Sequence, residues 1–178
     1  FQRAVASPEP RAILELETVG VLVEAGAVVI CAGGGGVPVV LSEAGGWIGV
    51  EAVVDKDLST ALLAEGLGAD LLMLLTDVDA VYEGWGSPGA RALSRVSPEA
   101  LRRLDLEPGT MGPKAEAVCR FVEATGNPAA IGALEDAPSI LRGARGTRVA
   151  AVRGDDLAFD NLALASITVA RYRVRHPL

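Results

Sequence analysis

The sequence predicts an α/β fold in which a mostly parallel sheet lies between layers of helices. Segments with helical periodicity alternate with short apolar runs along most of the 178 residues. The apolar runs, such as 27–32 and 70–78, are continuously hydrophobic rather than alternating with polar residues. This pattern is typical of strands that are covered on both faces, as in a parallel sheet between helices.

The first part of the chain is expected to contain a helix at 9–26, strands at 27–32 and 49–55, a helix at 57–68 and a strand at 70–78. Pro10 falls in the first turn of the first helix, and Gly26 ends it. Asp57 is expected to cap the second helix, because a side-chain oxygen at that position accepts from unpaired backbone N–H groups. The run at 70–78 is the strongest strand signal, since it is apolar throughout and ends in turn-forming residues.

The second part is expected to contain a surface arm or hairpin at 82–96, a short helix at 97–104, a helix from 113 to about 125, a strand at 129–134, a weak helix near 135–142 limited by Pro138, and a strand at 146–152. Ala115, Val118, Cys119 and Val122 recur at i, i+3, i+4 and i+7, which indicates one helical face. Pro113 suits the first helical position, where its missing N–H costs nothing.

The last stretch, 153–178, does not fit this pattern. It ends in a basic segment that carries the single histidine, His176. It looks appended to the rest of the chain, and two interpretations stay open: a strand-like extension, or a floppy tail.

Composition narrows the class of protein. Half of the residues are hydrophobic, so the chain is too apolar to be disordered. The net charge of -7 and the absence of a Lys/Arg cluster argue against a nucleic-acid partner. The longest apolar runs, about 9 residues, are too short to span a membrane.

We recognise no signal peptide, and Cys31 and Cys119 are expected to be two reduced core thiols of a cytosolic protein. A chain that opens on Phe1 without Met suggests a processed or truncated product.

Four glycines, Gly33, Gly34, Gly35 and Gly36, come directly after the expected strand at 27–32. Glycines here let the backbone approach an anion closely, with N–H groups turned toward it. The pattern is neither a P-loop nor a GxGxxG fingerprint. The alternative is a tight turn from strand to loop.

Two lysines stand where a positive charge is unfavourable. Lys56, between Asp55 and Asp57, precedes one helix, and Lys114 falls in the first turn of another. A cation at this end of a helix dipole costs ~0.3–1 kcal/mol unless an anion is present. Each has a plain alternative: Asp57 as an N-cap with solvated neighbours, and Lys114 as a surface lysine whose stem snorkels.

Together the lysines are more informative. Both helices follow loops at what should be one edge of one sheet, so the two ammonium groups are expected to meet there. Asp57, between them, would hold them in place. A polyphosphate supplies the missing anion, and positive charge around a transferring phosphoryl group is what phosphoryl transfer requires.

Asp77 and Asp79 follow the expected strand at 70–78. They would hold Mg²⁺ through waters and substrate phosphates, or alternatively cap turns. Tyr82, a few residues on, would flank a flat ring or belong to the core.

Three segments carry a family resemblance: "ICAGGGGVPVV", "GVEAVVDKDLSTALLAEGLGADLLMLLTDVDAVY" and "GTMGPKAEAVCRFVEATG", with "SPEP" before the first helix. From about residue 3 to 149 the chain resembles the carbamate kinase branch of the amino acid kinase family. The resemblance implies a three-layer α/β/α sandwich and reversible phosphoryl transfer between ATP and carbamate, with carbamoyl phosphate and ADP as partners of the reverse reaction. It also implies Mg²⁺, a cytoplasmic homodimer and a place in arginine metabolism.

The resemblance also implies roles for single residues. Lys56 and Lys114 would be catalytic and contact the phosphates, with Asp57 organising both. The nucleotide-binding candidates, around the transferred phosphoryl group or the nucleotide, are Gly33, Gly34, Gly35, Gly36, Asp55, Asp77, Asp79, Tyr82, Met111, Gly112 and Pro113. No residue is expected to be a direct ligand of a protein-held metal.

The chain departs from the family pattern at both ends. The family's opening strand with its "GGNA"-type glycine turn, and the half-chain after it, have no counterpart here, and neither does the tail. We therefore expect a nucleotide-binding portion at 1–150 and a foreign extension at 151–178, with weak ATP/ADP binding and little or no turnover. Two alternatives remain: a family member that acts on another carboxylate or small phosphate, and an inactive fragment that serves as an interaction module.

Overall fold

The computed structural model describes residues 4–151 and 167–171. Its elements, in chain order, are α1 (Leu16–Glu24), β1 (Val39–Leu41), β2 (Trp47–Gly49), α2 (Lys56–Gly66), β3 (Leu71–Thr76), β4 (Val81–Glu83), β5 (Arg91–Leu93), β6 (Arg95–Val96), α3 (Pro98–Arg102), α4 (Met111–Thr125), β7 (Ala129–Ala133), the 3₁₀-helix η1 (Leu134–Asp136), α5 (Ala137–Leu141), β8 (Thr147–Val149) and β9 (Ile167–Arg171).

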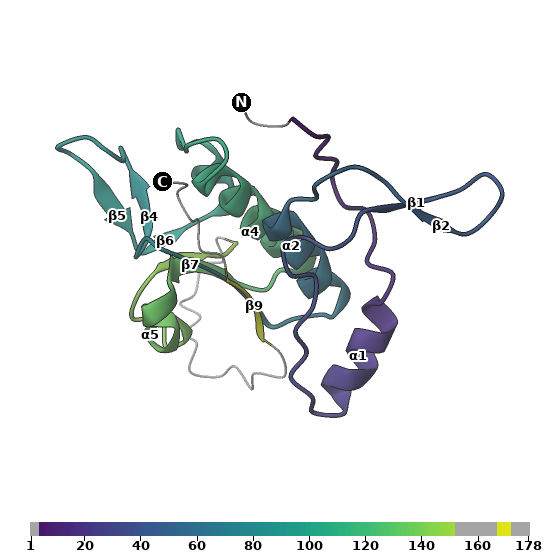
Figure 1. The fold of residues 1–178 in the computed structure, drawn as a ribbon. Coiled ribbons are helices and arrows are strands. Elements are labelled where there is room, and N and C mark those ends of the chain that lie inside the picture. Colours follow the sequence, from purple (N-terminus) through teal and green to yellow (C-terminus); the bar gives the residue numbers. More distant parts are fainter. Residues whose placement is uncertain (1–3, 152–166, 172–178) are drawn as a thin grey trace.

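The main sheet has the strand order β6-β8-β7-β3-β9 (Figure 1). β3 pairs in parallel with both β7 and β9, and β6 pairs in parallel with β8. Only the β7–β8 pair is antiparallel among these neighbours. The expectation of a mostly parallel sheet is therefore confirmed.

Helices cover both faces of this sheet, and β3 shows why its sequence is apolar throughout. Leu72 and Leu74 belong to the core cluster that contains residues of α2 and α4. Leu71 and Met73 belong to the opposite cluster, with Ile140 of α5. Figure 1 shows α2 and α4 above the strands and α5 below them. Because successive side chains of a strand point to opposite faces, a strand between two helical layers needs apolar residues at every position.

The helices α2 and α4 lie close to where they are expected, but their first residues differ. The N-cap of α2 is Asp55, not Asp57: the Asp55 side chain accepts from the N–H groups of Asp57 and Leu58. Helix α4 begins at Met111, two residues before Pro113. A proline is accepted there as well, because the first turn has no intrahelical acceptor for its N–H.

Two expected strands are wrong. Within the described residues, 27–32 forms no strand, and the side chains of Val28 and Ile30 are 95% and 96% exposed. The segment 49–55 contributes only the last residue of β2 and an isolated bridge between Ala52 and Ala6. An apolar run becomes a strand only beside a strand with open backbone groups. Among the described residues, no strand pairs with 27–32, and 49–55 has only the pairing of Gly49 with β1 and the single bridge to Ala6.

Other elements differ in extent rather than type. The first helix begins at Leu16 rather than residue 9, and the antiparallel hairpin β1–β2 was not expected at all. The segment 82–96 does contain the expected hairpin, formed by β4 and β5. Of the two interpretations of 153–178, strand β9 agrees with the strand-like extension. Residues 152–166 and 172–178, with His176, lie outside the described residues.

The two cysteines have different surroundings. Cys119 is buried as expected; its thiol donates to the Pro98 carbonyl at 3.5 Å, and burial raises its pKa to about 11. Cys31 is exposed, so the expectation of two core thiols is wrong for Cys31, which lies in the unpaired segment 27–32. Among the described residues, no helix combines the length and apolar character needed to cross a membrane.

Candidate functional site

The structure brings Lys56, Asp57 and Lys114 into one cluster. Lys114 Nζ lies 3.0 Å from Asp57 Oδ2 and 3.2 Å from Asp57 Oδ1. Lys56 Nζ lies 3.5 Å from Asp57 Oδ2. Asp57 and Lys114 are buried, at 2% and 7% exposure, whereas the Lys56 side chain keeps 21% of its surface exposed. The cluster therefore holds two cationic side chains on one buried carboxylate.

The packing of α2 on α4 produces this contact. The two helices are in contact, and small residues of both, Ala61 and Ala64 of α2 and Ala115 of α4, belong to one core cluster. Because Asp55 already caps the backbone of α2, the carboxylate of Asp57 is available for side-chain cations. Small residues let helix axes approach closely, so a lysine and an aspartate on neighbouring first turns come within contact distance.

This contact resolves the unfavourable position of Lys114. The positive end of the α4 dipole disfavours its ammonium group, but a buried carboxylate lies directly against it. Asp57 itself is in the first turn of α2, where a negative charge is favoured. Lys114 is only 7% exposed to solvent, so the alternative of a snorkelling surface lysine is wrong.

The glycine loop lies against the beginning of α2. Ser59 Oγ donates to the Gly35 carbonyl at 2.9 Å. Gly35 has φ +129, and a Cβ on it would lie 2.2 Å from the Val54 carbonyl oxygen, so this position requires glycine. The loop therefore reaches the helix end that carries Lys56.

Three N–H groups of the glycine loop donate to nearby carbonyl groups. Gly33 donates to the Cys31 carbonyl, and both Gly35 and Gly36 donate to the Ala32 carbonyl. Their donors are thus engaged within the loop, contrary to the expectation of N–H groups directed at an anion. The loop backbone does approach α2 closely at Gly35. The three N–H groups could bind an anion only if the loop changed its conformation.

A pocket of about 300 Å³ opens beside the lysines. It is bordered by the start of α2, the end of β3, the β4–β5 hairpin and the loop that leads into α4. Its lining residues are Lys56, Thr76, Asp77, Val78, Ala80, Tyr82, Trp85, Asp105, Leu106, Glu107, Gly109, Thr110, Met111 and Lys114. Five sequence candidates, Lys56, Asp77, Tyr82, Met111 and Lys114, therefore share one cavity of a size that small-molecule sites have.

The aromatic wall of the pocket is held by Asp79. The Tyr82 hydroxyl donates to Asp79 Oδ1 at 3.0 Å, and this hydrogen bond raises the pKa of Tyr82. The Tyr82 and Trp85 rings meet edge to face, with centroids 5.0 Å apart and planes at 62°. Beside them, Thr76 Oγ1 donates to Asp77 Oδ1 at 3.0 Å. Two flat rings and an oriented carboxylate thus occupy the end of the pocket formed by β3 and β4.

Several candidates do not line the pocket. Asp55 caps α2, Asp57 lies behind the lysines, and Asp79 holds Tyr82. Of the four glycines, Gly35 is buried against α2, whereas Gly33, Gly34 and Gly36 are exposed; Gly112 and Pro113 lie within α4. Gly112 has a packing reason to be glycine, since a Cβ there would lie 3.2 Å from the Glu107 carbonyl oxygen.

Sequence reasoning missed Trp85 and the segment 105–110. Trp85 lies in the turn of the hairpin within 82–96, which the sequence predicts as a surface arm or hairpin without assigning it to a site. The segment "DLEPGT" immediately precedes "MGPK", and its Gly and Pro content marks a loop next to a candidate site. That adjacency was the available signal. Among the described residues, no group of three or more His, Cys, Asp or Glu side chains is arranged to hold a metal ion.

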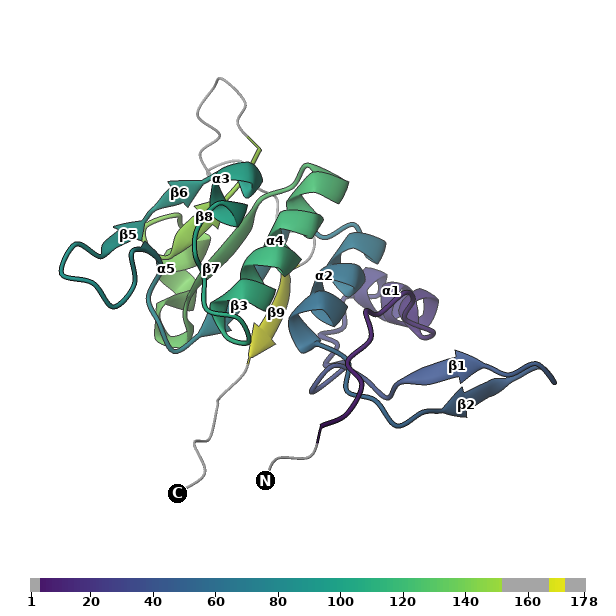
Figure 2. The ribbon, with the colours of Figure 1, turned by 90° about the horizontal axis from the view of Figure 1, so that it is seen from above.

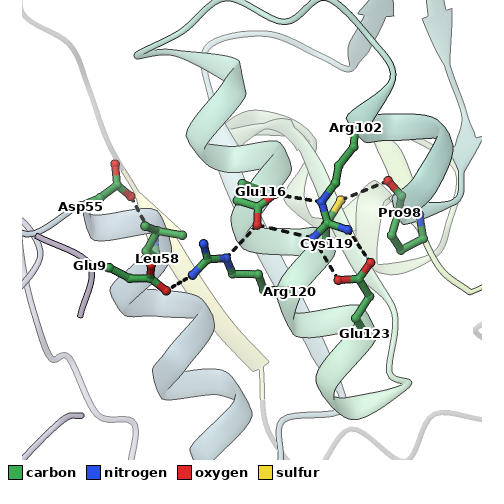
Figure 3. A network of polar contacts seen from close by, with 9 residues as sticks. All are labelled: Glu9, Asp55, Leu58, Pro98, Arg102, Glu116, Cys119, Arg120 and Glu123. Atoms are coloured by element: carbon green, nitrogen blue, oxygen red, sulfur yellow. Dashed lines mark hydrogen bonds and ion pairs between the residues drawn. The ribbon is translucent and has the colours of Figure 1, made fainter. Parts of the chain in front are cut away.

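An ion network fixes the helices on either side of this loop. Arg102 of α3 pairs with Glu116 and Glu123 of α4, and Arg120 pairs with Glu116 and with Glu9 (Figure 3). Hydrogen bonds from Arg102 lower the pKa of Glu123. The same hydrogen bonds, with those to Glu116, raise the pKa of Arg102. The network ties α3 and residue 9 to α4, so the pocket-lining loop is anchored at both ends.

The chain is similar to proteins of known class. The model of the amino acid kinase family matches residues 2–133. A carbamate kinase from Rhizobium meliloti (strain 1021) is 50% identical over 157 residues, which cover 87% of this chain and 48% of that protein. A carbamate kinase from Haemophilus influenzae is 48% identical over 149 residues, covering 84% and 48%. The chain spans about half the length of the curated relatives it matches.

Solved structures agree with this relationship. The carbamate kinase from Giardia lamblia bound to AMP-PNP has a TM-score of 0.79 and 37% identity, covering 82% of this chain and 52% of that one. A structure from Aeropyrum pernix K1 has a TM-score of 0.75 and 45% identity, covering 82% and 48%. Since the family model matches well over half of the chain, this chain belongs to the amino acid kinase family.

Proposed function

We propose that the chain carries the nucleotide-binding part of a carbamate kinase-type phosphotransferase. The whole protein would interconvert carbamoyl phosphate plus ADP with carbamate plus ATP. The observation that carries the proposal is the buried Asp57 carboxylate, which holds Lys114 and Lys56 at one end of a 300 Å³ pocket. The similarity to carbamate kinases at about half of their length supports it.

The pocket offers complementary chemistry to a nucleoside polyphosphate. Lys56 and Lys114 would contact the phosphates, and Asp57 would act as a positioning residue that fixes both ammonium groups. At the other end, Tyr82 and Trp85 offer aromatic surface to a nucleobase. Fixed positive charge facing the phosphates needs no reorganisation when charge develops during phosphoryl transfer.

A divalent cation fits the donor set of the pocket only in part. Asp77, Asp105 and Glu107 line it and supply the oxygen donors that Mg²⁺ prefers. Since no metal cluster of three such residues exists among the described residues, we propose that Mg²⁺ is carried mainly by the phosphates of ATP or ADP. Bound in this way, Mg²⁺ would neutralise phosphate charge, and Asp77 is the residue that we expect to face it.

Further features of the whole protein belong to the same proposal. We propose that residues 1–150 form the nucleotide-binding portion and 151–178 an extension. We also propose a cytoplasmic homodimer with a role in arginine metabolism. This chain by itself is expected to bind ADP or ATP weakly and to show little or no turnover, because phosphoryl transfer needs an acceptor held against the nucleotide.

Isothermal titration of the chain with ADP and Mg²⁺ tests the nucleotide site, next to a coupled ATP-forming assay with carbamoyl phosphate. We expect measurable ADP binding and little ATP formation. If ADP does not bind, the nucleotide site is refuted and an interaction module is favoured. Robust turnover would refute the expectation of inactivity. ATP formation from another acyl phosphate but not from carbamoyl phosphate would favour a different acceptor within the family.

A further inference from the structure

β3 has partners on both edges, and the second partner comes from the far end of the chain. β7 pairs with one edge and β9 with the other, in a register from Leu71↔Ile167 to Leu75↔Arg171. With β9 in place, residues 71–75 are at most 3% exposed, and the pairing supplies hydrogen-bond partners to the backbone N–H and C=O groups along this edge. β9 therefore pairs with the second edge of β3, a strand that is buried from Leu71 to Leu75.

β9 also lies against α2. The two elements contact each other, and Figures 1 and 2 both place β9 next to α2. The parallel register brings the end of β9 beside Leu75, one residue before Thr76, which lines the pocket. β9 thus lies between the strand that ends at the pocket and the helix that begins with Lys56 and Asp57.

A second segment of the chain has the composition for this position and does not occupy it. The segment 27–32 is apolar and precedes α2, yet Val28 and Ile30 are almost fully exposed. β9, by contrast, lies outside residues 2–133, which match the family model. The edge of β3 is therefore taken by a strand from beyond the family-matched residues.

We propose that β9 is a positioning element of the candidate site. It completes the sheet at β3 and supports α2 from below, so that Lys56 and Asp57 stay in place against Lys114. The expected effect on nucleotide binding rests on the proposed function, whereas the expected effect on the stability of β3 and α2 does not. Loss of β9 pairing should therefore loosen β3 and α2 and weaken nucleotide binding.

The test compares two proline variants of the full chain. Val169→Pro removes a backbone donor in the middle of β9, and Val28→Pro makes the same chemical change in the exposed segment. Hydrogen exchange of β3, α2 and α5 is followed by mass spectrometry, with ADP·Mg²⁺ titrations in parallel. Val169→Ile, which keeps the N–H, should behave as the parent does. If Val169→Pro unfolds globally, Val169→Gly replaces it as the milder change.

We expect Val169→Pro to raise exchange in β3 and α2 by about tenfold or more, to leave α5 protected, and to weaken ADP binding by about tenfold. Val28→Pro should match the parent in both measurements. The proposal is overturned if Val169→Pro changes neither exchange nor binding, or if Val28→Pro alone loosens β3. Faster exchange with unchanged ADP affinity would refute the positioning role. If the parent itself fails to bind ADP, the proposed function fails, and exchange in α2 still decides whether β9 supports this helix.

Discussion

Lys114 Nζ and Asp57 Oδ2 lie 3.0 Å apart in the interior, on the first turns of two different helices. A second lysine, Lys56, reaches the same carboxylate from the pocket side. Removing one member of a buried pair leaves the other charge without compensation, which costs far more than the pair contributes. The stability of the fold and the geometry of the candidate site thus depend on one carboxylate.

Replacing this carboxylate should destabilise the protein. We expect Asp57→Asn to lower the free energy of unfolding by about 3–5 kcal/mol, because Lys114 then remains buried without its anion. Urea denaturation measures the change. Asp55→Asn is the matched control: asparagine caps helices as well as aspartate does, so its effect should stay within a few tenths of a kcal/mol. Equal stability of the two variants would contradict a structural role for Asp57.

Lys56 should matter for nucleotide rather than for folding, since its side chain is partly exposed. We expect Lys56→Ala to weaken ADP·Mg²⁺ binding by roughly tenfold or more, the effect of losing a charge-assisted hydrogen bond of about 1.5–3 kcal/mol. Titration calorimetry measures this loss. Arg91→Ala removes the same charge from the β4–β5 hairpin at a residue that does not line the pocket, and it should bind ADP normally. ADP affinity that survives Lys56→Ala would mean that Lys56 is only a surface charge.

Neighbouring glycines should respond differently to the same substitution. Gly35→Ala places a Cβ 2.2 Å from the Val54 carbonyl oxygen at φ +129. We expect this variant to lose about 1–3 kcal/mol of stability and to displace the loop from α2. Gly34→Ala, one residue earlier, meets no atom within 4 Å and should be tolerated. Urea midpoints of the two variants give the comparison; similar values would show that the loop does not need its observed contact with α2.

Trp85 is expected to contribute to nucleobase binding. Trp85→Ala removes one of the two rings at the far end of the pocket, and we expect ADP affinity to fall by roughly three- to tenfold. Trp47→Ala removes the same side chain from strand β2, where it is 55% exposed and does not line the pocket. Competition between ADP and inorganic pyrophosphate separates the two ends of the site. A Trp85→Ala variant that loses affinity for pyrophosphate as strongly as for ADP would argue against a contact with the base.

Acid should weaken the network around Glu116. Burial raises the pKa of Glu116, but the hydrogen bonds from Arg102 and Arg120 outweigh it and hold the pKa below 4.5. A carboxylate with a depressed pKa stabilises the fold above its unfolded value of about 4.5, and this contribution is lost as pH falls through the folded value. We expect the parent to lose more stability between pH 7 and pH 3 than Glu116→Gln does.

Urea unfolding at several pH values measures this difference. Glu43→Gln, in the exposed loop between β1 and β2, is the control and should follow the parent. If Glu116→Gln shows the same pH profile as the parent, the network does not contribute to acid stability.

The sequence predicts the parts of the fold that are held by continuous local patterns. β3 was expected because its apolar run is long, and α4 because its apolar residues share one face. The meeting of Lys56, Asp57 and Lys114 followed from the rule that helices begin at one edge of a parallel sheet. The segment 27–32 has the same local pattern as a buried strand, but a strand also needs a neighbour, and hydropathy carries no information about that neighbour.

The missed pocket residues have a related cause. Trp85 and the segment 105–110 lie in a turn and a loop, where no periodicity marks which side chains face inward. The N-cap of α2 was displaced by two residues because Asp55 and Asp57 have the same chemistry at the same junction. Only the backbone hydrogen bonds distinguish the cap from the residue that binds the lysines.

The pairing of β3 with β9 has a consequence for synthesis on the ribosome. Leu71 pairs with Ile167, which follows it by 167 − 71 = 96 positions. At roughly 5–20 residues per second, the earlier strand waits about 5–20 s for its second neighbour to be made. During this interval β3 can pair only with β7 and pack against the helices that are close to it in sequence. Pairs so distant in sequence raise the contact order and slow folding, so the pairing of β9 with β3 is a late step in completing this sheet.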